Sequence, residues 1–163
     1  MIQITGLTKT YGTGSKTVHA LNGVDLQINS GMFGLLGPNG AGKTTFMRIL
    51  AGIINPSSGS IRVDGHDLTT EAGKHAVKSM LGYLPQELGM YTELSAEQFV
   101  DYMAILKGLD DSSRRNKRVA EVLEMVGLRD VAKRKIKGFS GGMKRRVGIA
   151  QALVNDPKIL IVD

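Results

Sequence analysis

Gly37-Pro38-Asn39-Gly40-Ala41-Gly42-Lys43-Thr44-Thr45 is the stretch that decides the fold of this sequence. The apolar run before it, at 32–36, predicts a strand, and the apolar-rich segment after it predicts a helix that begins at Lys43. Gly37 and Gly42 permit backbone conformations in which successive N–H groups point at one anion. A helix that begins at Lys43 turns the positive end of its dipole toward the same anion. The stretch therefore predicts a phosphate-binding loop between a strand and a helix.

The first two residues of the predicted helix are suited to bind the phosphates of a nucleotide and the metal ion that accompanies them. Lys43 can reach the β- and γ-phosphates, and the hydroxyl of Thr44 is placed to ligate Mg²⁺. Mg²⁺ suits such a site because it prefers hard oxygen ligands, most of which the phosphates supply. A glycine-rich turn before an ordinary helix is the alternative interpretation. We favour phosphate binding because the predicted strand and helix flank the turn in the order that such a loop needs.

Composition limits the class of protein. With 163 residues, 42% of them hydrophobic, the sequence is long enough for one domain with a sizeable core. It has no cysteine, which excludes disulfides and thiolate metal sites. The sequence shows neither a signal peptide nor an apolar run of about 18 residues, so we expect a cytosolic protein.

Positive charge is concentrated in one segment. Between residues 107 and 146 there are 13 Lys or Arg residues against 5 Asp or Glu residues, whereas acidic residues outnumber basic ones elsewhere. Such a segment can face nucleic acid or an anionic membrane surface. We favour the interpretation that these charges lie on solvated helix faces, which is the common reason for such clusters.

Periodicity predicts an amino-terminal half that is rich in strands. The expected elements are strands at 2–5, 18–28 and 60–65, a short run at 81–86, a loop at 10–15 and a polar helix at 71–80. Pro85 favours an extended conformation at Leu84, so Gln86 should lie in a loop just past the end of a strand.

From Ser95 onward the pattern becomes helical. Ser95 and Gln98 form the sequence signature of a capping box. Two apolar stripes are expected to pack in the core, one of Phe99, Met103 and Leu106 and the other of Val119, Val122, Leu123 and Val126. A further helix should begin after the turn at 138–143 and end near Val154, before a buried parallel strand at 159–163. Asp163 would then lie at the carboxyl end of that strand, where an open α/β sheet binds ligands.

A second anion-binding turn completes the pattern. Ser140, Gly141 and Gly142 stand at a predicted helix start, about a hundred residues after Lys43 and shortly before the strand that ends in Asp163. With these motifs in this order, all 163 residues resemble the ATP-binding subunit of an ABC transporter. The resemblance implies an α/β fold: a P-loop NTPase core with amino-terminal antiparallel β strands and a helical subdomain between the Walker A and signature motifs. It divides a single ATP-binding domain into a β-rich and P-loop part (1–94), a helical subdomain (95–140) and a part with the signature helix and Walker B strand (141–163).

The resemblance also assigns roles to individual residues. The stretch 37–45 is similar to the Walker A loop, and Tyr11 stands where the family stacks an aromatic ring on adenine. Gln86 matches the Q-loop glutamine, which approaches Mg²⁺ and the attacking water, and Asp163 matches the Walker B aspartate, which holds Mg²⁺ through water. The residues expected to bind ATP are Tyr11, Gly37, Pro38, Asn39, Gly40, Ala41, Gly42, Lys43, Thr44, Thr45, Ser140, Gly141 and Gly142. The expected metal ligands are Thr44, Gln86 and Asp163, and the expected catalytic residues are Lys43, Gln86 and Asp163.

The sequence departs from the family pattern in two ways. Phe139 and Met143 stand where the signature motif usually has Leu and Gln, although the Ser-Gly-Gly between them is kept. The family also has a catalytic glutamate directly after the residue that Asp163 matches, and a later switch histidine. We therefore expect the sequence to be a fragment that ends inside the Walker B motif, and we assign no role to its three histidines.

The resemblance implies partners as well as an activity, ATP hydrolysis. The family works as a homo- or heterodimer of ATP-binding subunits on a transmembrane transporter subunit, at the cytoplasmic face of the cell membrane, and no direct contact with nucleic acid is expected. The segment 83–87 and the capped helix after Ser95 most resemble the branch that exports drugs and antibiotics. One alternative is an ABC ATPase that acts on nucleic acid or the ribosome, which the basic segment invites. Another is a P-loop GTPase or kinase, although Asn116-Lys117-Arg118-Val119 lacks the aspartate of a guanine-binding motif.

Overall fold

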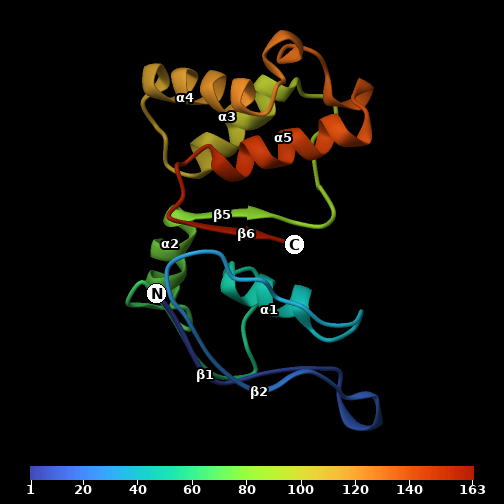
Figure 1. The fold of residues 1–163 in the computed structure, drawn as a ribbon, viewed down its shortest axis with the longest axis vertical. Helices are drawn as coiled ribbons and strands as arrows, with labels where there is room; N and C mark the ends of the chain where they lie inside the picture. Colours follow the sequence, from blue (N-terminus) through green and yellow to red (C-terminus); the bar gives the residue numbers. More distant parts are fainter. The chain divides into compact units, whose positions relative to one another are not determined.

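The structure is a computed structural model that describes residues 1–163 except the side chain of Ser15. The chain forms two compact units, Met1–Lys78 and Ser79–Asp163 (Figure 1). The first unit contains an antiparallel sheet of four strands, and the second contains a parallel pair of strands with three helices. The α/β class and the amino-terminal antiparallel strands are therefore as predicted.

The sheet of the first unit is built around its first strand. The elements are β1 (Ile2–Tyr11), the 3-10 turn η1 (Gly14–Lys16), β2 (Val18–Ile28), β3 (Ser58–Val63) and β4 (His66–Asp67). The strand order is β2-β1-β3-β4, and all neighbours are antiparallel. Asp64 and Gly65 join β3 to β4 with positive φ angles of 49° and 84°, as a two-residue hairpin turn of the mirror-image type requires.

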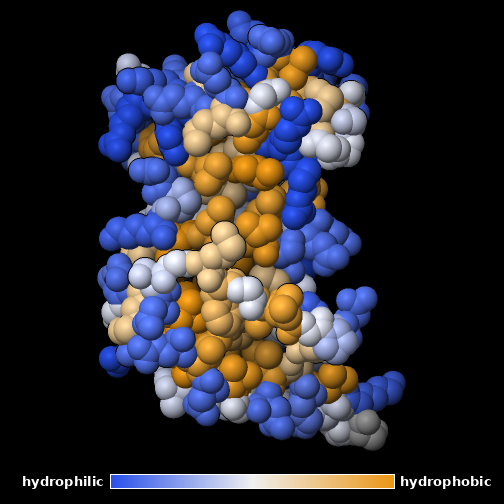
Figure 2. Space-filling model, in the orientation of Figure 1, coloured by the Kyte–Doolittle hydropathy of each residue, from blue (hydrophilic) through white to orange (hydrophobic). Residues whose placement is uncertain are grey.

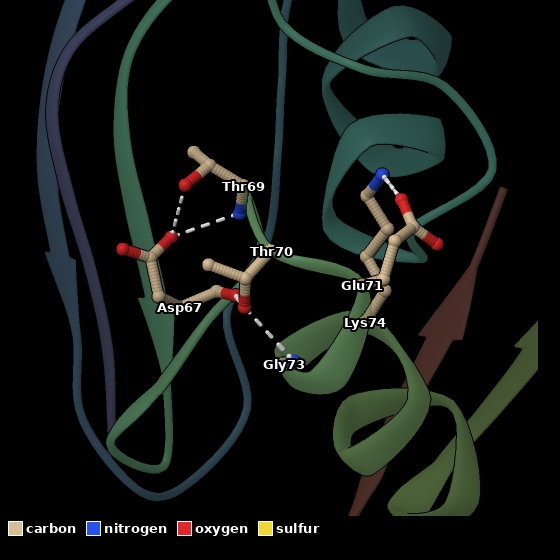
Figure 3. A network of polar contacts seen from close by, with 6 residues as sticks. All are labelled: Asp67, Thr69, Thr70, Glu71, Gly73 and Lys74. Atoms are coloured by element: carbon tan, nitrogen blue, oxygen red, sulfur yellow. Dashed lines mark hydrogen bonds and ion pairs between the residues drawn. The ribbon is translucent and has the colours of Figure 1, made fainter.

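Two helices accompany this sheet. The helix α1 (Lys43–Leu50) begins where the glycine-rich stretch predicts, and it buries Phe46, Ile49 and Leu50. The helix α2 (Glu71–Met80) follows a polar turn that Figure 3 shows from close by. In that turn the Asp67 carboxylate accepts hydrogen bonds from the amide and the hydroxyl of Thr69, at 2.8 and 2.7 Å. The Thr70 hydroxyl accepts a hydrogen bond from the Gly73 amide at 3.0 Å, which satisfies one of the donors that a helix start leaves open.

The strand predicted at 32–36 is not formed. This segment has no regular secondary structure, and Met32 and Leu36 are almost fully exposed. A strand exists only where its N–H and C=O groups pair with a neighbour. Among the described residues, the run at 32–36 pairs with none of the four strands of its unit. The prediction was therefore wrong because an apolar run specifies burial but supplies no pairing partner.

The second unit has a short parallel strand pair. The strands are β5 (Leu81–Leu84) and β6 (Ile159–Val162), which pair in register from Leu81 with Ile159 to Leu84 with Val162. The helices are α3 (Ala96–Leu106), α4 (Ser112–Met125) and α5 (Gly141–Leu153), with 3-10 turns at Arg129–Val131 and Ile136–Gly138. Within this unit α5 lies beside the strand pair, and α3 and α4 lie beyond it (Figure 1).

Close backbone contact joins the strand pair to α5. A Cβ atom on Gly82 of β5 would lie 2.1 Å from the carbonyl oxygen of Ala152 in α5, so only glycine fits there. The capping box predicted for α3 is present: the Gln98 amide donates to Ser95 Oγ at 3.1 Å, and the Ser95 amide donates to Gln98 Oε1 at 2.9 Å. The core of the unit contains Phe99, Val119, Val122 and Leu123, as the two stripes predict.

Two predictions of burial in this unit were wrong. Leu106, assigned to the α3 stripe, is exposed because it is the last residue of the helix. The strand β6 is parallel as predicted, but Leu160 and Val162 are 48% and 55% exposed, while Ile161 is buried. Alternate side chains of a strand point to opposite faces. Within residues 79–163 the face that carries Leu160 and Val162 is left uncovered, so the apolar run is only half buried.

The basic segment lies on the helical side of this unit. Arg114 and Lys117 of α4 are exposed, and Figure 2 shows mainly hydrophilic side chains over α4. Lys135 and Lys137 both reach the carboxylate of Glu93, at 3.3 and 3.2 Å. These four charges lie in solvent or pair locally, as the interpretation as solvated faces expects. Arg115 and Arg118 of the same segment depart from it, because their side chains are only 14% and 23% exposed.

Candidate nucleotide-binding site

The glycine-rich loop owes its shape to one close approach. Gly42 has a φ of 85° and precedes α1, and a Cβ atom there would lie 2.2 Å from the carbonyl oxygen of Ala20 in β2. Any other residue would be strained by its conformation and would also overlap the strand. The amide of Ala41 donates to the Pro38 oxygen at 3.2 Å, and the amide of Phe46 donates to the Gly42 oxygen at 2.8 Å. The loop is therefore a defined turn pressed against β2.

Lys43 places a positive charge at this turn. Its ammonium donates hydrogen bonds to the carbonyl oxygens of Gly37 and Pro38, both at 2.7 Å. No acidic residue lies in the first turn of α1, so nothing in that turn neutralises the helix dipole or the lysine. Thr44 and Thr45 follow in the same turn and are half-buried. The loop, the lysine and the helix start together form an electropositive turn of the kind that binds phosphate.

Tyr11 lies near the same turn. It is the last residue of β1, not part of the loop predicted at 10–15, because β1 continues to pair with β2 as far as Tyr11 and Val18. Val18, which pairs with Tyr11, is two residues or about 7 Å of strand from Ala20. The carbonyl of Ala20 in turn faces Gly42 of the phosphate-binding turn. The ring is 44% exposed. An exposed aromatic ring therefore lies within nucleotide length of the phosphate-binding turn.

In the second unit, Gln86 and Asp163 both lie at the carboxyl edge of the parallel strand pair. The parallel strands β5 and β6 end at Leu84 and Val162, so the residues that follow leave the same edge of the pair. The Asp163 amide donates to the Leu84 oxygen at 2.9 Å, and the Tyr83 hydroxyl donates to Asp163 Oδ2 at 3.2 Å. Gln86 is exposed, two residues past the strand end, as Pro85 predicts. The side chains of Gln86 and Asp163 end in an amide and a carboxylate, whose oxygens are metal ligands of the kind that Mg²⁺ prefers.

Arg145 is a residue of this edge that sequence reasoning missed. Its guanidinium donates to the oxygen of Pro85 at 3.1 Å and to the backbone oxygen of Asp163 at 3.3 Å. One side chain of α5 thus connects the ends of both strands. The sequence carries no signal for this contact, because Arg145 stands between two other basic residues, Lys144 and Arg146.

The signature turn is exposed at the start of α5. Ser140 caps the helix, and its hydroxyl accepts a hydrogen bond from the Met143 amide at 3.2 Å. Gly141 and Gly142 are exposed, whereas Phe139 is only 5% exposed and belongs to the helical core, with Met143 packed partly against it. The two residues that depart from the family pattern are therefore packing residues, and the Ser-Gly-Gly between them faces solvent.

The expected site residues thus form two groups. Tyr11 and the loop 37–45 lie together in the first unit, and Gln86, Asp163 and the turn 140–142 belong to the second. The expected metal ligands are divided between the units, with Thr44 in the first. Each of the three expected ligands, Thr44, Gln86 and Asp163, has a side-chain oxygen that can coordinate a metal, so their chemistry fits Mg²⁺.

Comparison with known proteins identifies the family. The family model described as "ABC transporter" matches residues 21–163, which is most of the chain. The chain belongs to the ABC transporter family. This membership removes the GTPase and kinase alternative. No helix among the described residues is both long and apolar enough to span a membrane.

Two curated relatives carry names that refer to different roles, one to resistance and the other to import. The chain is 42% identical to the linearmycin resistance ATP-binding protein LnrL of Bacillus subtilis (strain 168), over 100% of the chain and 50% of LnrL. It is 38% identical to the methionine import ATP-binding protein MetN 2 of Rhodococcus jostii (strain RHA1), over 100% of the chain and 48% of MetN 2. The chain therefore spans about half the length of the curated relatives it matches.

The fold is that of solved ABC cassettes. A dimeric structure of the ATP-binding cassette MJ0796 in a post-hydrolysis state, bound to ADP and Pi, superimposes with a TM-score of 0.89. The sequences are 31% identical, and the match covers 100% of this chain and 73% of that one. The predicted P-loop cassette fold is confirmed.

Proposed function

We propose that this chain is the part of an ABC transporter subunit that binds ATP and, in the assembled transporter, hydrolyses it. The observation that carries this proposal is the turn at 37–45, in which Gly42 is pressed against β2 and Lys43 sits over the loop. Family membership and the likeness to a cassette bound to ADP and Pi support the same ligand.

The chain's own residues divide the work on ATP. Tyr11 stacks on the base, the loop amides and Lys43 hold the phosphates, and Gln86 orients the attacking water. By resemblance to the family, Thr44, Gln86 and Asp163 would hold Mg²⁺, which would neutralise charge on the phosphate oxygens. Residues 140–142 cover the γ-phosphate held by a second ATP-binding subunit. The dimeric state of the similar cassette MJ0796 supports this arrangement.

We further propose that the subunit works on a transmembrane partner at the cytoplasmic face of the membrane and drives export. The likeness to LnrL, which is named for linearmycin resistance, supports export. The segment 83–87 supports it as well, because it resembles the drug-exporting branch. The chain is similarly identical to a methionine import protein. The direction of transport therefore needs a direct test.

Binding of ATP is tested by calorimetric titration of the purified protein, with Mg²⁺ and with excess EDTA. We expect saturable binding of one ATP per chain, weaker in EDTA because the phosphate charge is then less well neutralised. Inorganic triphosphate should compete with ATP, since the loop holds the phosphates. Failure of triphosphate to compete would contradict the assignment of the loop.

Direction is tested on the assembled transporter in inside-out vesicles, where ATP reaches the ATP-binding subunits from outside. Export predicts that labelled antibiotics accumulate in the vesicles when ATP is added. The Lys43→Ala variant should not support this accumulation. ATP-driven loss of a preloaded solute such as methionine would contradict export.

A further inference from the structure

The ring of Tyr11 has a cation above it. Lys9 stands two residues before Tyr11 in β1, and side chains two apart in a strand lie on the same face. The Lys9 ammonium is 5.1 Å from the centroid of the Tyr11 ring. That distance is within the range of a cation–π interaction, in which the positive charge is attracted to the electron-rich face of the ring.

The position of this ammonium is set by a second contact. Lys9 Nζ donates a hydrogen bond to the carbonyl oxygen of Asn55 at 2.8 Å, in the turn between α1 and β3. The same turn is joined to β1 on both sides of Lys9. The Ser57 amide donates to the Thr8 oxygen at 2.9 Å, and the Thr10 amide donates to Ser57 Oγ at 2.9 Å. The lysine is therefore held by the turn that follows α1, and it does not move freely in solvent.

We propose that Lys9 is a positioning residue for recognition of the nucleotide base. Its ammonium covers one face of the Tyr11 ring and fixes the ring's orientation, so that the opposite face is offered to the base. A partly exposed side chain that is already ordered loses less conformational freedom when a ligand stacks on it. This inference rests on the proposed ATP-binding function, and it adds a residue that acts on the base through Tyr11.

The proposal differs from a direct role of Lys9 in phosphate binding. A lysine that contacts phosphate would contribute equally to ATP and to inorganic triphosphate, whatever residue stands at position 11. A lysine that acts through the ring contributes only to ligands with a base and only while the ring is present. A double-mutant cycle between Lys9 and Tyr11 separates the two roles.

The experiment measures dissociation constants of ATP and inorganic triphosphate for Lys9→Met and Lys9→Arg, each with Tyr11 and with Tyr11→Leu. Lys117→Met, at an exposed position of α4, is the control for loss of one positive charge. For Lys9→Met we expect ATP affinity to fall about two- to fivefold, as loss of an exposed cation–π contact predicts. Affinity for triphosphate should not change. Lys9→Arg should bind ATP as wild type does, because a guanidinium also interacts with an aromatic face.

In the Tyr11→Leu background, the change Lys9→Met should have no further effect on ATP. The inference is overturned by equal losses of ATP and triphosphate affinity, by a loss that persists with Leu at position 11, or by unchanged ATP affinity in Lys9→Met. Lys9→Gln serves as a second charge-removing variant should Lys9→Met not fold. A wild-type protein that binds no ATP would instead overturn the proposed function, so the two failures are distinct.

Discussion

The proposed role of Lys43 requires its ammonium to exchange hydrogen-bond partners when a nucleotide binds. Its ammonium now donates to the carbonyl oxygens of Gly37 and Pro38, and a phosphate would offer charged oxygens in their place. We expect Lys43→Ala to weaken ATP binding about tenfold to a hundredfold, because a charge-assisted hydrogen bond contributes roughly 1.5–3 kcal/mol. Titration with a fluorescent ATP analogue measures this, with Lys117→Ala as the matched control. Equal affinities of Lys43→Ala and wild type would remove Lys43 from the site.

Tyr11 is expected to act through its ring and not through its hydroxyl. Tyr11→Phe should therefore bind ATP as wild type does, whereas Tyr11→Ala should lose roughly 1–2 kcal/mol of binding free energy, by analogy with stacking on nucleic-acid bases. Because every base has an aromatic face, ATP and GTP should be affected alike. The same titration measures both nucleotides. Wild-type affinity in the alanine variant would show that Tyr11 does not contact the base.

At the scale of elements, the contact between β5 and α5 decides where the carboxyl edge of the strand pair lies. The backbone of Gly82 touches that of Ala152, and neither backbone can move without moving its element. We expect Gly82→Ala to lower the free energy of unfolding by roughly 1–3 kcal/mol, as overpacking does. Gly89→Ala is the matched control, because a Cβ atom there meets open space. Urea denaturation compares the two, and similar midpoints would contradict the close packing of β5 on α5.

The turn before α2 makes stability depend on pH. Hydrogen bonds from the Thr69 side chain and amide hold the pKa of Asp67 below its ordinary value. A lowered folded-state pKa stabilises the fold above the unfolded pKa, about pH 4, and this contribution is lost as pH falls through the lower folded value. We therefore expect Thr69→Ala to be less stable than wild type at pH 7, with a difference that shrinks below about pH 4. Thermal unfolding from pH 7 to pH 2.5 measures the difference, and one that grows toward low pH would be contrary to this sign.

At the scale of the whole molecule, the exposed turn at 140–142 is where we expect a second copy or a related subunit to bind. Its amides and the Ser140 hydroxyl lie at the start of α5, which suits contact with a phosphate held by another chain. We expect Ser140→Ala to leave ATP binding by the isolated protein within about twofold of wild type. The ATP-dependent dimer should weaken about tenfold or more through loss of a charge-assisted hydrogen bond.

Light scattering at increasing protein concentration in ATP gives the dimer affinity. Ser112→Ala at the start of α4 is a control that makes the same chemical change at an exposed helix end. Phosphate release by the assembled transporter should fall more in Ser140→Ala than ATP binding does. Dimerisation that is unaffected by Ser140→Ala would contradict the proposed role of the turn.

The sequence by itself determined several helix and strand ends, because their causes lie within a few residues of one another. The glycine at 42 and the residues after it specify where α1 begins, Ser95 and Gln98 supply both halves of a capping box, and Pro85 ends β5. The order of these motifs was also enough to predict the family and the cassette fold. The site residues named from that resemblance remain predictions, except that their placement within each unit is now known.

Tertiary structure alone decided which apolar runs become buried strands and which side chains meet. The runs at 32–36 and 159–162 look alike in the sequence, yet the first is unpaired within its unit and the second is buried on one face only. The contacts of Arg145 with two strand ends, and of Lys9 with Tyr11 and the Asn55 carbonyl, were equally unforeseen. Pairing and burial depend on groups far away in the chain, and a local pattern records how apolar a segment is but not which partner reaches it.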